Sequence, residues 1–316
     1  MIDNGNRLLT SGLKLRHLQL LDLLQETGQL GLAAAQMGIA QPAASRLLSE
    51  IETILGRPVH ERLGRGLALT AAGQTLARRA ARMFLELRDA EREIESHDAG
   101  QSGHVRIGSV TGPAMDRILP ALQKARHILP GVTTEITVGP SDLLVRQLLA
   151  GALDFALGRP PRGADRALLS IQVIEPEPVA LMVRRGHKLQ GCRNLRPEDL
   201  MEFDWVFPGA EVILGRTVLA RLAACGLPHP PQRISTSSFL LTLALVQQSD
   251  AIAPLARAVV RTFASGPDAP FALLPIDLGI EVESFSLLRR QGAALPPVAE
   301  NLLAMVLAPP ADSPRP

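Results

Sequence analysis

Short polar side chains gather at the start of a helical segment near residue 41. Gln41 and Ser45 are one helical turn apart, so they face the same side of that helix. A helix that reads bases must enter a major groove about 12 Å wide, and glutamine is suited to bidentate contact with adenine. The short or polar candidates for DNA contact are Gln41, Pro42, Ala43, Ser45, Arg46 and Ser49. Ordinary packing also produces such helices, and the residues alone leave that alternative open.

The elements around this segment predict a helix-turn-helix. Apolar leucines recur at helical spacing up to a stop at Gly28, and a short alanine-rich helix follows from Leu30 to Met37. The polar helix then runs from Gln41 to a stop at Gly56, with a proline in its first turn. Two helices joined by a short glycine-containing turn are the arrangement that places the second helix in the major groove.

Arginines dominate the next segment. Two extended pieces flank residues 63–66, which predicts a tight hairpin carrying Arg62 and Arg65. Such a hairpin can reach phosphates or a minor groove. From residue 57 to residue 82 six arginines stand against one acid, whereas residues 85–98 hold two arginines and six acids. Because nearly all basic residues of this chain are arginine, a compositional bias explains the block equally well.

A long helix is predicted from Thr70, as its N-cap, to about Glu95. Apolar residues recur along it at steps of four, three, four, three and four: Leu76, Ala80, Met83, Leu87, Ala90 and Ile94. This heptad pattern favours pairing with the same helix of a second copy. A stripe buried against its own domain has similar spacing. The glycine-containing break at residues 99–103 leaves little chain to cover the stripe, so we predict dimerisation through it.

Strands alternate with helices from residue 104 onward. Strand-like segments at 105–110, 132–138 and 153–157 are separated by helical segments at 114–127 and 141–150, and the pattern resumes between residues 178 and 248. This alternation predicts βαβ units and a mostly parallel sheet.

Composition and motifs argue against several other classes of protein. The 316 residues, of which 46% are hydrophobic and 20% charged, predict a folded chain of about two domains with a net charge of +2. With only Cys192 and Cys225, neither a disulfide framework nor a Cys-rich zinc site is expected, although a redox switch between the two stays open. We find no nucleophile elbow, P-loop or His-Glu-x-x-His motif, and the histidines do not cluster. We therefore expect no enzyme activity, cofactor or metal. No segment predicts a signal peptide or a membrane span, so we expect a cytoplasmic protein.

One stretch resembles the winged helix-turn-helix of LysR-type transcriptional regulators over residues 13 to about 95 without a gap. The matching motifs are Gly28 to Arg46, Ile51-Glu52, Leu55-Gly56, Glu61-Arg62, Arg65-Gly66 and Leu69-Thr70-Ala-Ala-Gly73. The chain departs from the family at Gln29, Ala40 and His60, where Ser, Ser or Thr, and Phe are usual. Ala40 thereby loses a helix N-cap worth about 1 kcal/mol.

The resemblance implies an α plus α/β architecture. Residues 13–71 would form the winged helix-turn-helix, residues 72–98 the linker and dimerisation helix, and residues 103–310 an effector domain like a type 2 periplasmic binding protein. That domain would have two α/β subdomains, one of residues 103–173 with 277–310 and one of residues 174–276, joined by crossovers near Ile174 and Leu274.

Ligands of this fold sit between the subdomains, at strand ends and helix N-termini. The residues that the resemblance places there are Ser109, Thr111, Gly112, Ser141, Arg159, Pro208, Gly209, Ser237 and Ser238. Each hydroxyl has an ordinary alternative role as a helix N-cap. Arg159 would pair with a ligand carboxylate or, equally, form a structural ion pair.

Residues 108–114 and 235–244 further resemble the galactose-binding-protein-regulator branch, which implies a sugar or sugar-acid effector. Because the chain has no Tyr and a single Trp205, the sequence leaves sugars, sugar acids and aromatic acids open. The partners implied are double-stranded promoter DNA, a small-molecule effector, a second copy in a homodimer or homotetramer, and RNA polymerase. The competing class is a solute-binding or biosynthetic α/β protein whose N-terminal helices only oligomerise it.

Overall fold

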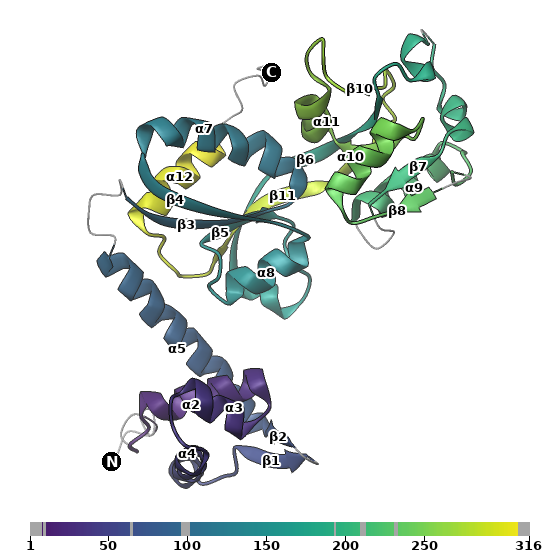
Figure 1. The fold of residues 1–316 in the computed structure, drawn as a ribbon. Coiled ribbons are helices and arrows are strands. Elements are labelled where there is room, and N and C mark those ends of the chain that lie inside the picture. Colours follow the sequence, from purple (N-terminus) through teal and green to yellow (C-terminus); the bar gives the residue numbers. More distant parts are fainter. Residues whose placement is uncertain are drawn as a thin grey trace. The chain divides into compact units, whose positions relative to one another are not determined.

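The computed structural model describes residues 8, 11–63, 66–95, 102–192, 194–208, 213–230 and 233–308. Contacts within the chain divide it into two compact units, residues 1–95 and 96–316 (Figure 1). Among the helices described, none combines the length and the apolar character needed to cross a membrane.

The N-terminal unit is a winged helix-turn-helix. Its elements are α2 (Leu15–Thr27), α3 (Leu30–Gln36), α4 (Gln41–Leu55), β1 (His60–Leu63), β2 (Gly66–Leu69) and α5 (Ala71–Glu95). Helices α2 and α4 end at Gly28 and Gly56, whose φ angles of 63° and 67° are left-handed and suit glycine. Both predicted helix ends are thereby confirmed, as is the hairpin, in which β1 and β2 pair antiparallel.

Four helices share the core of this unit. Apolar side chains at helical spacing point inward from α2, α3, α4 and the first turns of α5, as the leucine pattern predicts. The buried members are Leu20, Leu21, Leu24, Ala33, Ala34, Ala44, Leu47, Leu48, Ile51, Val59, Leu69 and Ala77. Burial of this face fixes which side of α4 remains exposed.

Helix α5 starts in a tight contact with the hairpin. The Thr70 hydroxyl accepts from the Gly73 N–H at 3.2 Å and donates to the Pro58 carbonyl at 2.9 Å, which confirms Thr70 as the N-cap. A Cβ added to Gly73 would lie 2.1 Å from the carbonyl oxygen of Val59. Only glycine fits at this position.

The C-terminal unit is built on a seven-stranded sheet in the order β10-β6-β11-β5-β3-β4, with β9 also paired to β6. Its strands are β3 (Ser102–Ser109), β4 (Gly131–Val138), β5 (Phe155–Gly158), β6 (Leu169–Arg184), β9 (Ala253–Ala256), β10 (Phe271–Leu273) and β11 (Glu281–Arg290). A separate pair joins β7 (Trp205–Phe207) to β8 (Arg233–Ser235).

The expectation of a mostly parallel sheet is wrong. Strand β3 pairs parallel with β4 and β5, and β7 with β8, but β11 runs antiparallel to both β5 and β6. Strands β9 and β10 are also antiparallel to β6. The reason lies in the two crossovers: β6 carries the chain out of the first half of the unit and β11 brings it back, so they run in opposite directions.

Helices cover both faces of the first half. The segment after β3 consists of α6 (Thr111–Pro113), a π-helical turn (Ala114–Ile118) and α7 (Leu119–Ile128), which extends the predicted helix of residues 114–127 at both ends. Helix α7 packs beside α12 (Pro297–Leu307) on one face, and α8 (Ser141–Leu149) lies on the other (Figure 1).

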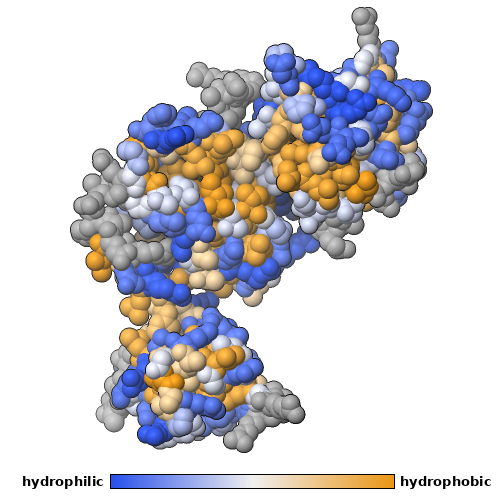
Figure 2. Space-filling view, in the orientation of Figure 1, coloured by the Kyte–Doolittle hydropathy of each residue, from blue (hydrophilic) through white to orange (hydrophobic). Residues whose placement is uncertain are grey.

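The second half carries α9 (Ile213–Ala224), α10 (Phe239–Gln248), α11 (Arg257–Ala264) and short 3-10 turns at 188–191 and 197–202. A further 3-10 turn at 164–168 precedes β6. Figure 2 shows an apolar patch over α10, where Leu240 and Leu241 are 77% and 48% exposed. An apolar surface of this kind is available to a ligand or to another protein surface.

The contact at Gly73 yields a stability prediction. Gly73→Ala should lower the free energy of unfolding by about 1–3 kcal/mol, because the added methyl meets backbone and forces α5 away from Val59. Gly31→Ala is the matched control: its Cβ would meet only the Gln41 side chain at 3.7 Å, so it should stabilise α3 by up to about 1 kcal/mol. Denaturant unfolding of both variants measures the difference. Equal effects would contradict the packing argument.

Candidate DNA-binding face and effector site

Helix α4 presents a smooth polar face. Its apolar side is buried in the core, which leaves Gln41, Pro42, Ser45, Arg46 and Ser49 exposed and Ala43 half-buried. Five of the six residues that the sequence nominates therefore lie on the outer side of one helix, and the sixth, Ala43, is only partly exposed. The exposed side chains near the N-terminus of α4 are short or polar, so a major groove can admit them.

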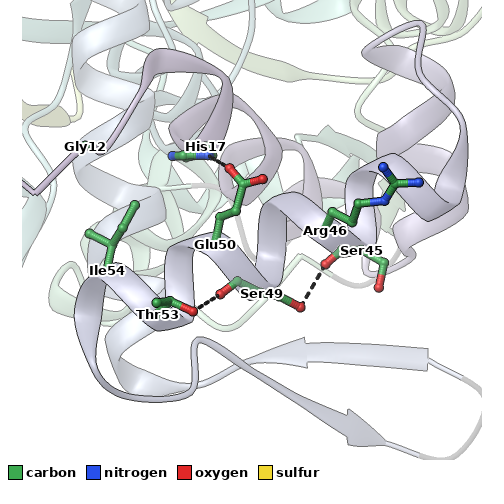
Figure 3. Close-up of a pocket in the computed structure, with 8 residues that line it drawn as sticks. All are labelled: Gly12, His17, Ser45, Arg46, Ser49, Glu50, Thr53 and Ile54. Carbon is green, nitrogen blue, oxygen red and sulfur yellow. Dashed lines mark hydrogen bonds and ion pairs between the residues drawn. The ribbon is translucent and has the colours of Figure 1, made fainter.

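A row of hydroxyls continues this face along the helix (Figure 3). The Ser49 hydroxyl donates to the Ser45 carbonyl at 3.2 Å, and the Thr53 hydroxyl to the Ser49 carbonyl at 2.8 Å. Because each hydroxyl folds back on its own helix, nothing bulky projects, while the oxygen lone pairs remain free to accept. The row borders a surface depression of about 490 Å³, lined also by Arg46, His17 and Glu50.

The start of α4 has no side-chain cap. Ala40 has the extended backbone of an N-cap residue, and its carbonyl accepts from the N–H groups of Ala43 and Ala44 at 2.9 and 3.2 Å. Pro42 in the first turn has no N–H to satisfy.

The hairpin is anchored to α4 through Glu52. The Glu52 carboxylate accepts from the Val59 N–H at 3.0 Å. His60 Nδ1 lies 2.9 Å from the same oxygen, without the alignment of a hydrogen bond. The Arg62 side chain and all of Arg65 lie outside the described residues, so their contact with DNA stays a prediction.

The apolar stripe of α5 divides into two parts. Leu76 packs half-buried against the unit's own core and Ala80 is fully buried, so for these two the own-domain alternative is correct. Met83, Leu87 and Ile94 are 46%, 51% and 71% exposed, and Ala90 is exposed as well. The later part of the stripe is therefore the part available to a second copy.

Part of the expected effector site forms one cluster, which we call the Glu177 cluster: Gly112, Ser141, Arg159 and Glu177. The Ser141 hydroxyl accepts from the Arg159 N–H at 2.9 Å, and the Arg159 guanidinium donates to the Glu177 carboxylate. The other oxygen of that carboxylate lies against Gly112, where an added Cβ would be 1.8 Å away. Thr111, half-buried, precedes Gly112 in the chain.

Two expectations for this site need correction. Ser109 is fully buried and its hydroxyl donates to the Val110 carbonyl at 2.8 Å, so it offers no surface to a ligand. Arg159 is in an ion pair with Glu177, both side chains being nearly buried at 10% and 13% exposure. Of the two roles expected for Arg159, pairing with a ligand carboxylate or forming a structural ion pair, the ion pair is the one observed.

The remaining candidates form a second group. Pro208 is half-buried after β7, and the Thr236 N–H donates to the Phe207 carbonyl at 3.0 Å, which joins the ends of β7 and β8. Ser237 and Ser238 follow, both exposed, and the Ser238 hydroxyl caps α10 by accepting from the Leu241 N–H at 3.2 Å. Gly209 lies outside the described residues. The described contacts join each group internally and do not link one to the other.

Arginines tie the crossovers to both halves of the unit. The Arg117 guanidinium pairs with Glu175 and donates to the Ala308 carbonyl, while the Arg159 Nε–H donates to the Glu283 carbonyl at 3.0 Å. On the second crossover, a hydrogen bond from the Gly279 N–H, together with one from Arg257, lowers the pKa of the Asp277 carboxyl.

Sequence analysis missed Glu175 and Glu177. Both lie on β6 two residues apart in Glu-Pro-Glu-Pro, a spacing that puts two side chains on one face of a strand. That alternation was the available signal. The sequence also did not reveal the contact between His17 and Glu50, which lie 33 residues apart in the chain and meet beside the exposed face of α4.

No metal site is found among the described His, Cys, Asp and Glu residues, and Cys192 and Cys225 are free and exposed. A winged helix-turn-helix joined to a two-part α/β unit with two crossover strands defines a class: DNA-binding regulators with a periplasmic-binding-protein-like effector domain.

Comparison with known proteins identifies the family. Residues 15–74 match the bacterial regulatory helix-turn-helix protein, lysR family, and residues 98–309 match the LysR substrate binding domain. The chain therefore belongs to the LysR family of transcriptional regulators. It is a DNA-binding regulator with an effector-binding domain, not an enzyme.

Curated relatives include two proteins called HTH-type transcriptional regulator GbpR. That of Rhizobium radiobacter is 42% identical over 258 residues, covering 81% of this chain and 85% of its own length. That of Azospirillum brasilense is 33% identical, covering 96% of this chain and 89% of its own length.

Solved structures share the fold. Full-length CbnR complexed with its target DNA is similar with a TM-score of 0.59 at 22% identity, covering 93% of this chain and 99% of CbnR. The C199D variant of OxyR from Pseudomonas aeruginosa gives 0.64 at 17% identity, covering 96% of this chain and 99% of OxyR.

Proposed function

We propose that this protein binds double-stranded promoter DNA as a homodimer or homotetramer, and that a small molecule bound in its C-terminal unit controls that binding. The observation that carries the proposal is the exposed face of α4, where short polar side chains stand clear of the core. The CbnR–DNA complex supports the same use of this unit. We include RNA polymerase among the proposed partners.

We propose further that the effector is an uncharged, hydroxyl-bearing molecule of the sugar class. A ligand carboxylate would seek Arg159, but Arg159 is nearly buried and already paired with Glu177. A ligand carboxylate placed beside Arg159 would also be repelled by the carboxylate of Glu177. Hydroxyl groups have no such conflict, because they can donate to a carboxylate and accept from Ser141 or Thr111. This reasoning favours sugars over sugar acids and aromatic acids.

Self-association is proposed through the exposed part of the α5 stripe. Met83, Leu87, Ala90 and Ile94 form an apolar face that the described residues of their own unit leave exposed. Pairing with the same face of a second copy buries it and places two recognition helices about a two-fold axis, which suits an operator with dyad symmetry.

Base reading by Gln41 is tested by Gln41→Ala. Affinity for a duplex selected with the wild-type protein should fall by about 1–3 kcal/mol, with little change on random DNA. Gln25→Ala, an exposed glutamine on α2, is the control. Arg65→Ala should instead weaken both duplexes alike and flatten the dependence of log K on log salt. Absence of any steep salt dependence in the wild type would favour the competing solute-binding class.

The α5 interface is tested by Met83→Glu. A buried unpaired carboxylate at the pairing face should yield monomers by light scattering and abolish tight operator binding. The control is Arg82→Glu, which adds negative charge at the neighbouring exposed position. Control protein that also dissociates, or a monomeric wild type, would count against the interface.

The effector class is tested by comparing galactose with galacturonate, which differ in one carboxylate. Galactose should raise the melting temperature of the wild type, because a ligand stabilises by RT ln(1 + [L]/Kd), and galacturonate should not. In Glu177→Gln, which frees Arg159 of its countercharge, galacturonate should become stabilising. The control is Glu175→Gln, which removes the other carboxylate of β6, the one paired with Arg117. It should behave like the wild type. A wild type that responds to the acid alone refutes the assignment.

A further inference from the structure

Arg46 and Glu50 occupy adjacent turns of α4. Side chains four residues apart on a helix are neighbours, with Cβ atoms about 5–6 Å apart, and opposite charges at this spacing ordinarily pair. Here they do not. Among the residues that the structure describes, no carboxylate lies within ion-pair distance of the Arg46 guanidinium. In Figure 3 the Glu50 side chain extends toward His17, and the Arg46 side chain extends away from this pair.

His17 takes the carboxylate instead. Its Nε2 lies 3.0 Å from Glu50 Oε2, the imidazole being 1% exposed and the carboxylate 54% exposed. His17 Nδ1 accepts from the Lys14 N–H at 3.1 Å. Because Nδ1 is an acceptor, the ring hydrogen of neutral His17 is on Nε2, which donates to Glu50. The first turn of α2 thus sets both the ring orientation and the tautomer.

The arrangement has a consequence for the polar face. Glu50 borders the same depression as Ser45, Arg46 and Ser49. A Glu50 side chain that is not held could swing along the helix to Arg46, neutralise it, and carry a negative charge toward approaching phosphates. Burial makes His17 a fixed donor, since its ring has no room to follow the carboxylate out.

We propose that His17 is a positioning residue for DNA recognition: by holding Glu50, it keeps the Arg46 guanidinium unpaired and available to DNA. The inference rests on the proposed use of α4 as the recognition helix. Wild-type protein that fails to bind any DNA would refute that function, whereas the variants below test His17 alone.

The first test separates the two hydrogen bonds of His17. In His17→Asn the amide oxygen can still accept from Lys14, but the side chain is too short to reach Glu50. In His17→Gln a donor remains where Nε2 was. Affinity of the full-length proteins for a duplex selected from random sequence by the wild type should fall by a factor of about 1.5 to 5 in His17→Asn, the range of one exposed ion pair. His17→Gln should match the wild type.

The second test asks whether the loss acts through Glu50. In His17→Asn/Glu50→Gln the affinity should return to within about twofold of the wild type, because no carboxylate is left to neutralise Arg46. The slope of log K against log salt should be shallower by about one in His17→Asn and restored in the double variant. A merely structural His17 would give the same loss with or without Glu50, and this result, like wild-type binding by His17→Asn, would overturn the proposal.

A third pair of variants leaves the buried ring untouched and guards against misfolding. Glu50→Asp keeps the charge but shortens the reach to His17, so it should weaken DNA binding as His17→Asn does. Glu50→Asn, equally short and neutral, should not weaken it. Equal affinities for the two proteins would overturn the proposal, and thermal unfolding verifies that both are folded.

Discussion

The C-terminal unit depends on one strand that both of its halves share. The 16 residues of β6 pair with β11 along their first part and with β9 and β10 along their second. A shift of register by one residue would turn every side chain of a strand to the opposite face, so the cores on both sides fix the same register. Glu175 and Glu177 lie where β6 leaves the first half. Their positions are therefore set by packing at both ends of the strand, and the arginines that meet them come from the first half alone.

In the N-terminal unit the corresponding constraint is the division of α4 into two faces. The same helical periodicity that buries Leu47, Leu48 and Ile51 exposes Ser45 and Ser49. Apolar bulk added to the outer face would bury nothing in this core and would hinder entry into a groove. The uncapped start at Ala40 is stabilised by Pro42, whose fixed φ lowers the conformational entropy of the unfolded chain.

Local features were predictable from the sequence because their causes are local. Gly28 and Gly56 end helices, Thr70 caps one, and the leucine spacing identifies the core faces. The resemblance to LysR-type regulators supplied the two-part architecture, which alternation of strands and helices does not determine. Long-range pairing was beyond reach: Arg159 has its partner 18 residues away on β6, and His17 contacts Glu50 33 residues away. Periodicity indicates which side of an element is exposed, but not which charged group lies opposite.

The contact of Glu52 with the hairpin bears on how this protein can diverge. One carboxylate on the recognition helix accepts from the Val59 N–H and faces His60, the residue that replaces the usual phenylalanine. Phenylalanine at position 60 would leave the hydrogen bond from the Val59 N–H to Glu52 in place, whereas a change at position 52 alone would leave that buried N–H without its acceptor. Position 60 is therefore freer to vary than position 52, and viable descendants of this sequence are those that keep a hydrogen-bond acceptor at position 52.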